Sequence, residues 1–316
     1  MSAEQLAELS DLFVVAAVLL YLFAMVGFAL ELAFGRAGSD QVVRRRARTP
    51  AAVGAGAGAQ DGTGVDEVAP VDQAVPAPRW ALRSGQVGLA LAWLGWAANL
   101  GAIATRGLAV DRWPWGNMYE FVVGICFAAV TAFLLTLLRH QVRFLGAFVM
   151  IAAALGLGLA AKVFYTAAGP VVPALNSYWI AIHVTAAILA SGLFILAGVA
   201  GVLYLVRSDG PSRLPSRAEL EKVAHRAIVL AFPLWTFAVI AGALWADRAW
   251  GRYWGWDPKE VWSFITWVGY AAYLHARVTA GWRGRASTIV QLVAFACLLF
   301  NLFGVNIFIS GLHSYA

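Results

Sequence analysis

Cysteine is almost absent from this chain of 316 residues, and charged side chains are scarce. Its two cysteines, Cys126 and Cys297, both fall within long apolar runs, and no Cys-x-x-Cys pair occurs. Thiol–disulfide exchange and a thiolate metal site are therefore not expected here. Charged residues make up 13% of the chain and hydrophobic residues 61%. This composition is typical of an integral membrane protein.

Eight apolar runs are long enough to cross a bilayer, which takes about 20 residues of helix. They cover residues 11–34, 86–105, 119–138, 144–162, 178–206, 227–246, 262–281 and 287–309. Backbone groups in lipid must be paired within the segment, and no alternating pattern indicates a barrel. The sequence therefore predicts an all-α integral membrane protein with about eight transmembrane helices. We expect the first helix to be retained, since no cleavage site of small residues follows it.

We divide the chain into a first transmembrane helix (1–35), a linker (36–84) and a seven-helix domain (85–316) that contains a tryptophan-rich segment at 245–267. The linker is first basic, then almost entirely Ala and Gly, then rich in Pro and acidic residues, with no apolar periodicity. Such a composition predicts a flexible segment on the cytoplasmic side.

Lysine and arginine are distributed unevenly between the connections. If the N-terminus is outside, seventeen of the 23 basic residues fall in the inner connections. The positive-inside rule then places both termini, together with the tryptophan-rich segment, on the outer face of the cytoplasmic membrane. This asymmetry accounts for the net charge of +6. No basic patch interleaved with aromatic residues indicates a nucleic-acid partner.

The tryptophan-rich segment contains Trp-Gly-Arg-Tyr-Trp-Gly-Trp-Asp-Pro-Lys-Glu-Val-Trp, between two apolar runs. One or two aromatic residues at a membrane interface are ordinary anchors, but this density predicts a flat aromatic surface for a planar ligand. The residues expected to position that ligand are Trp250, Trp254, Trp256, Asp257 and Trp262. For Asp257 we favour a structural role as the N-cap of a helix with Pro258 at its first position.

Three histidines are candidate ligands. His183, near the outer end of the fifth span, is either a functional residue or a neutral histidine bonded to a neighbouring backbone. His313 lies just beyond the eighth span at the same interface, where a solvated histidine is the ordinary alternative. Two imidazoles facing each other across an aromatic surface can ligate an iron from both sides, which predicts haem. His275, in the inner half of the seventh span, is either a second ligand or a packed histidine. His140 and His225 sit at inner ends of spans beside arginines, where a topological role is preferred.

The propionates of haem require cationic donors. The outer segments offer four whose spacing does not distinguish them: Arg112, Arg248, Arg252 and Lys259. Another outer motif, Asn117–Glu120, either caps a helix through Asn117 or contributes Glu120 to the lining of the haem site.

Together these segments resemble the CcsA/ResC subunit family of the system II cytochrome c synthase. The resemblance covers most of residues 86–316 and is carried by Asn117–Glu120, Tyr178–His183, Trp250–Trp267, Tyr273–Gly284 and Gly304–Ala316. It implies transport of haem b across the membrane and attachment of its vinyl groups to the Cys-x-x-Cys-His thiols of apocytochrome c. It also implies that a "WWD" segment holds haem between two outer histidines, which match His183 and His313. His275 matches a family histidine that binds haem in transit with a histidine of a partner subunit.

The resemblance further implies three partners: a CcsB/ResB-type membrane subunit, apocytochrome c and a thioredoxin-like thiol reductant. The expected activity is that of a holocytochrome c synthase active only with its partner subunit. Three alternatives remain at this stage. They are a haem exporter or binding subunit without synthase chemistry, a b-type di-haem electron-transfer subunit, and the haem-handling proteins of system I, which share the tryptophan segment.

Overall fold

The computed structural model describes residues 1–35, 78–209 and 212–313, and within these ranges the chain is helical with no strand. The long helices are α1 (Ala3–Phe34), α3 (Arg79–Val110), α4 (Met118–Arg139), α5 (Gly146–Val163), α6 (Thr185–Val206), α7 (Arg217–Trp250), α8 (Pro258–Thr279) and α9 (Arg285–Leu299). A short α10 (Val305–Phe308) follows α9, and 3-10 turns occupy Arg143–Leu145 and Pro173–Leu175. Two π-helical turns, at Ile180–Val184 and Phe300–Gly304, interrupt otherwise regular helices.

The expected all-α membrane architecture is confirmed. Seven helices among the described residues are long and apolar enough to cross a membrane. The remaining expected span corresponds to α8, which has 22 residues and therefore sufficient length. Its sequence is more polar, because Glu260, His275 and Arg277 lie among its apolar residues.

The helix boundaries differ from the expected spans mainly by extension. α1 begins at Ala3, where Ser2 and Gln5 form a reciprocal capping box. α3 begins at Arg79, so residues 79–84 are helical and do not belong to the expected linker. The rest of that linker, residues 36–77, lies outside the described part of the chain. α7 also extends beyond its expected span at both ends, from Arg217 to Trp250.

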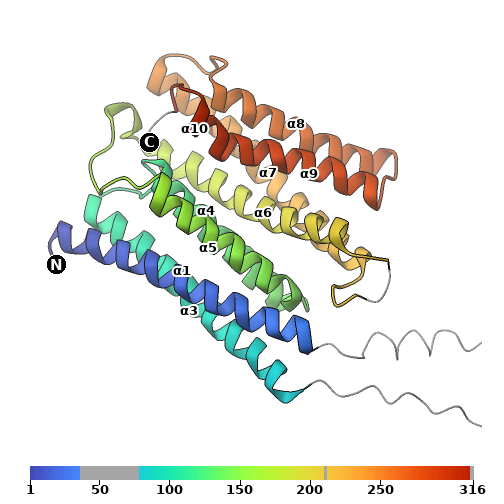
Figure 1. Ribbon diagram of the computed structural model, residues 1–316. Helices are drawn as coiled ribbons and strands as arrows, with labels where there is room; N and C mark the ends of the chain where they lie inside the picture. The colour runs from blue at the N-terminus through green and yellow to red at the C-terminus, as the bar shows by residue number, and fades with distance from the viewer. Residues whose placement is uncertain (36–77, 210–211, 314–316) are drawn as a thin grey trace, which may run out of the picture.

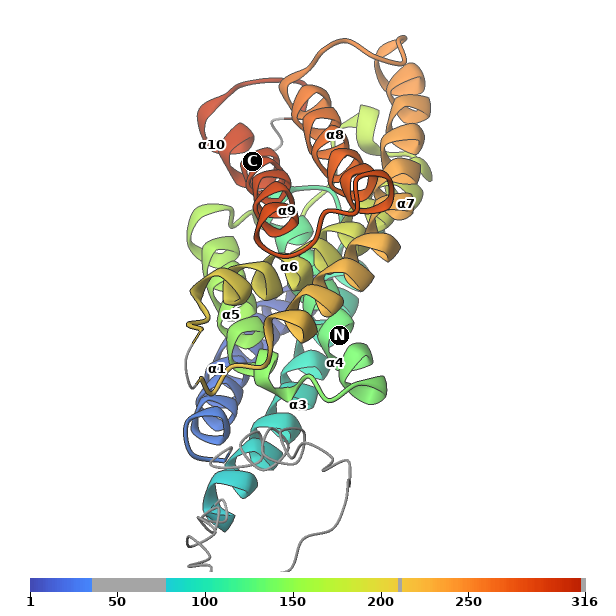
Figure 2. The ribbon, with the colours of Figure 1, turned by 90° about the vertical axis from the view of Figure 1, so that its right-hand side faces the viewer.

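The helices form two groups joined through α6. α1 packs on α3 and α5, while α6 packs on α4, α7 and α9, and α8 packs on α9. Figure 2 shows α6 between the α1–α3 pair and the group formed by α7, α8 and α9. α1 and α3 approach closely because both carry glycine at the contact: a Cβ on Gly27 would lie 2.7 Å from the Ser84 carbonyl oxygen. Between the groups, the rings of Phe194 and Tyr270 stack with centroids 3.8 Å apart.

One end of the bundle gathers the segments that matter for function. The N-terminus and α10 lie at this end, together with the α7–α8 connection (Figure 1). The C-terminal end of α1 and the N-terminal end of α3 lie at the opposite end. The bundle therefore brings the tryptophan-rich connection and the residues after α10 to the same end.

Candidate functional site

A cavity opens at this end of the bundle, among α4, α6, α7, α8 and the residues after α10. It encloses about 1140 Å³ of space not filled by protein atoms, its open mouth included. Apolar residues and glycine form most of its wall, including seven aromatic residues: Trp115, Phe121, Trp235, Trp245, Trp250, Tyr253 and Trp254. Seven polar side chains also line it: Asn117, His183, Lys259, Glu260, Ser263, Asn301 and His313. A mostly apolar cavity with a few placed polar groups is the usual form of a small-molecule site.

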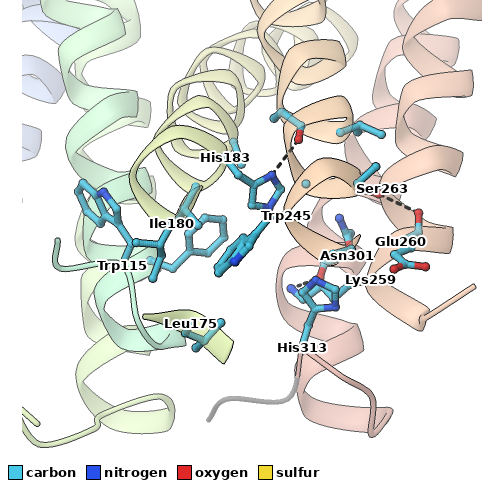
Figure 3. Close-up of a pocket in the computed structure, with 18 of the residues that line it drawn as sticks. Trp115, Leu175, Ile180, His183, Trp245, Lys259, Glu260, Ser263, Asn301 and His313 are labelled. Atoms are coloured by element: carbon cyan, nitrogen blue, oxygen red, sulfur yellow. Dashed lines mark hydrogen bonds between the residues drawn. The ribbon is translucent and has the colours of Figure 1, made fainter. Parts of the chain in front are cut away.

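His183 lies on the π-helical turn that precedes α6 and is held by α7. Its Nδ1 lies 2.8 Å from the carbonyl oxygen of Ala238, so Nδ1 carries the proton and donates it (Figure 3). Gly242, one turn further along α7, leaves room for the ring, since a Cβ there would lie 2.7 Å from His183 Cε1. With Nδ1 protonated, the ring's lone pair is on Nε2. π turns of this kind frequently occur at functional sites.

His313 is held by Asp257, the residue that begins α8. Its Nδ1 donates to Asp257 Oδ2 at 2.8 Å, and the backbone N–H of Leu312 donates to Oδ1 at 2.6 Å. The backbone N–H of Lys259 donates to Oδ2 at 3.1 Å, which makes Asp257 the N-cap of α8, as predicted. Burial raises the pKa of Asp257, but the hydrogen bonds from His313, Leu312 and Lys259 outweigh it and leave the pKa below its ordinary value. Asp257 therefore remains ionised beside His313.

The two histidines thus share one arrangement. Each donates from Nδ1, His183 to a backbone carbonyl and His313 to a carboxylate, and each lines the same cavity. Histidines that ligate a metal almost always have their second nitrogen fixed in this way. For His183 the two interpretations left open by the sequence hold together: the residue is bonded to backbone, and it also lines the cavity.

Some of the other residues expected at the site line the cavity, and others lie outside its lining. Trp250, Trp254 and Lys259 line the cavity. Trp262 does not line it but packs against Phe300 with the two rings tilted by 46° and their centroids 4.3 Å apart. Trp256 also lies outside the lining and is 69% exposed, with a left-handed φ of 57° that bulky residues rarely adopt.

Arg252, Glu120 and His275 are also outside the lining. Arg252 is exposed, and its guanidinium lies 3.4 Å from the Gly255 carbonyl oxygen. His275 is exposed on α8, away from the cavity lining, with Thr279 Oγ1 3.4 Å from its Nδ1. Neither Arg252 nor His275 lines the cavity.

Glu120 belongs to a buried ion cluster next to the cavity. Its carboxylate accepts hydrogen bonds from Arg106 Nε at 3.1 Å and from Arg112 Nη1 at 2.9 Å. The backbone N–H of Gly116 donates to it at 2.7 Å. Arg112 is therefore engaged by Glu120, and Asn117 caps α4, which was one of the two alternatives for this motif.

Sequence reasoning did not single out Trp115, Trp245 or Asn301. Trp115 stands in the same outer motif as Asn117, and Trp245 begins the tryptophan-rich segment, so an aromatic count at the outer ends of spans could have found both. Asn301 lies on the second π turn and is 4% exposed. Its amide within an apolar span was the available signal.

Comparison with known proteins identifies the family. The sequence model of a family described as "Cytochrome C assembly protein" matches residues 115–313, which include both cavity histidines. The chain belongs to this family. It is 33% identical to "Cytochrome c biogenesis protein CcsA" of Synechococcus elongatus, over 73% of this chain and 86% of the relative. It is 30% identical to the CcsA protein of Gloeobacter violaceus, over 68% of this chain and 82% of that protein. The resemblance to the CcsA family is thereby confirmed.

A solved structure shares the fold. The chain described as "Cytochrome c Heme Lyase CcmF" matches with a TM-score of 0.59 and 18% sequence identity. The match covers 96% of this chain but 47% of that one, so this chain spans about half the length of that protein. At this identity the likeness shows a common helical architecture.

Proposed function

We propose that this chain binds haem b between His183 and His313, at the outer face of the cytoplasmic membrane, for covalent attachment to apocytochrome c. The observation that carries the proposal is the matched pair of imidazoles, each fixed through Nδ1 on the wall of one aromatic cavity. The family of cytochrome c assembly proteins supports it. The distribution of lysine and arginine supports the outer location.

The chemistry requires positioning more than acid or base groups. Each thioether forms when a cysteine S–H of the Cys-x-x-Cys-His motif adds across a haem vinyl group. The sulfur bonds to the vinyl carbon next to the ring, the hydrogen ends on the terminal carbon, and nothing leaves. Holding the two reactants in register can remove about 7–11 kcal/mol of barrier. Ligation by His183 and His313 fixes the ring, and tryptophans such as Trp245 and Trp250 limit the access of water to it.

A second chain completes the pathway in this proposal. His275 is exposed on α8, at a surface where a CcsB/ResB-type subunit could supply a second histidine for haem in transit. The similarity to proteins named CcsA supports such a partner. The thiols belong to the apocytochrome, whose cysteines a thioredoxin-like protein keeps reduced.

The test is haem content after co-expression with the partner subunit. We expect purified wild-type complex to hold a low-spin haem in reduced optical spectra, and His183→Ala or His313→Ala to lose most of it. Added imidazole should restore part of the spectrum by filling the vacated position. His140→Ala is the matched control, because His140 lies outside the cavity lining and bonds Arg226. Haem content indifferent to both cavity histidines would refute the site.

A second measurement separates attachment from transport. Apocytochrome c supplied to the same cells should acquire covalently bound haem, detected on denaturing gels. A complex that binds haem through His183 and His313 but yields no thioether product would be a haem-binding or export subunit.

A further inference from the structure

One corner of the cavity is polar, with Lys259, Glu260, Asn301 and His313 in its lining. Among the described residues that line it, Lys259 is the only lysine or arginine. Figure 3 shows Lys259 close to Asn301 and His313, at one side of the cavity. The other sides are lined mainly by aromatic and small apolar side chains, such as Trp115, Leu175 and Ile180 (Figure 3).

Lys259 is incompletely paired within the described chain. An ammonium group has three donors, and Nζ makes one hydrogen bond, to the backbone carbonyl oxygen of Asn301 at 2.8 Å. Asp257, two residues earlier, directs its carboxylate oxygens to Leu312 and His313 and to the backbone N–H of Lys259, not to its ammonium. Among the described residues, no ion pair is formed by Lys259.

The position of Lys259 on α8 makes its unpaired charge more costly. It lies in the first turn of α8, where the aligned peptide dipoles favour anions and disfavour a cation. A partly desolvated ammonium with one hydrogen bond is expensive unless a counter-ion approaches it. Because the ammonium borders the cavity, an anionic group of the bound ligand would provide that counter-ion.

Asn301 is a second polar side chain in this corner of the cavity. It is 4% exposed, and its side-chain Oδ1 has no hydrogen-bond partner among the described residues. Buried polar atoms are nearly always hydrogen-bonded. Its side chain lines the cavity beside Lys259. Oδ1 is an acceptor, so the amide can bond to a carboxylate only through its Nδ2 donors.

We propose that Lys259 and Asn301 form a carboxylate subsite, in which the ammonium and the Asn301 amide bind a carboxylate of the ligand. The inference rests on the proposed haem site, since haem carries two propionates. It also selects among the candidate cations. Arg112 is engaged by Glu120, Arg248 lies over the Tyr178 ring outside the lining, and Arg252 is exposed outside the lining.

The test compares haem with haem dimethyl ester, which lacks both carboxylates. Each is titrated optically into the purified full-length chain with its partner, in detergent. Wild type should bind haem about tenfold to a hundredfold more tightly than the ester, the range for a hydrogen bond to a charged group. Lys259→Met should lose this preference while binding the ester as wild type does, which also shows that the variant is folded. Arg252→Met, which removes a positive charge in the same segment, should retain the preference.

A second variant covers the case in which Lys259→Met does not fold. Asn301→Asp is nearly the same shape and places a negative charge beside the carboxylate. It should weaken haem binding by at least about tenfold, with little effect on the ester. The subsite is overturned if wild type binds both compounds equally, or if Lys259→Met and Asn301→Asp both keep the wild-type preference. Failure of wild type to bind either compound would instead overturn the haem site itself, and the subsite with it.

Discussion

Replacing Asp257 with asparagine separates the charge of this residue from its shape. Asparagine caps helices about as well as aspartate, so the start of α8 should be preserved. The amide has one oxygen, however, whereas the carboxylate accepts from Leu312 on Oδ1 and from His313 on Oδ2. One of these donors will face the NH₂ group. An amide oxygen in the Oδ2 position keeps the capping bond to Lys259 and faces His313, so the NH₂ group faces the Leu312 N–H. We expect this donor–donor contact to displace the segment that carries His313, so that the imidazole loses its orientation.

The expected magnitude follows from the geometry. Loss of a partner that orients a metal-ligating histidine typically costs about 10- to 100-fold in affinity, or about 1.4 to 2.8 kcal/mol. The assay is an optical haem titration of the purified complex, with added imidazole as the rescue. Asp111→Asn is the matched control, since Asp111 is exposed and its left-handed φ of 48° suits asparagine. Wild-type haem affinity in Asp257→Asn would show that the carboxylate does not orient His313.

The same variant has a signature in pH. The pKa of Asp257 is lowered from its ordinary value of 3.8, because the hydrogen bonds from His313, Leu312 and Lys259 outweigh burial. The unfolded chain therefore binds this proton more readily than the folded chain. The stabilisation is complete above pH of about 4 and is lost as the pH falls through the lowered pKa. Thermal melts of wild type should show this additional acid sensitivity, and melts of Asp257→Asn should lack it.

Two further changes test the surroundings of the site. Gly242→Ala places a Cβ 2.7 Å from the His183 ring, so haem affinity should fall even though alanine is the better helix former by about 1 kcal/mol; Gly158→Ala on α5, with open space around it, should leave haem affinity unchanged. A Gly242→Ala variant with wild-type affinity would contradict the close packing of that ring. Glu120→Gln removes the nearest counter-ion of the buried Arg106 and of the half-buried Arg112, and should destabilise the protein by about 3 kcal/mol in thermal or denaturant unfolding, with haem affinity changed less than in His183→Ala. Unchanged stability would show that the cluster contributes no net energy.

Local signals in the sequence predicted the helical spans and several of their ends. Runs of apolar residues located the helices, and the Asp-Pro pair predicted the cap at Asp257, while capping by Asn117 was one of two alternatives. These features depend on neighbours within a few residues, so the sequence carries them directly. The pairing of His183 with His313 at one site was also predicted, because both lie at the same end of their spans.

The contacts that define the site were not predictable in this way. The partner of His183 is Ala238, a backbone carbonyl on another helix, and the room for its ring depends on Gly242. Neither residue type signals such a role. Trp256 and Arg252 were expected at the site because they share a segment with Trp254. The segment is an irregular loop, however, and the directions of its side chains follow no period that the sequence reveals. The position of Glu120 outside the cavity lining also depends on tertiary packing, because its arginine partners lie on α3 and in the loop after it.

The attachment of His313 to Asp257 has a consequence for biosynthesis. A membrane protein is made and inserted from its N-terminal end, so α1 to α7 can pack before residues near 313 leave the ribosome. At that stage His183 can already bond to Ala238, since the two are 55 positions apart, but the second imidazole does not yet exist. A nascent chain would offer an iron one axial nitrogen, and only a chain synthesised through residue 313 would offer two. In the proposed haem site, the second axial ligand therefore becomes available only after α8 and α9 have been made.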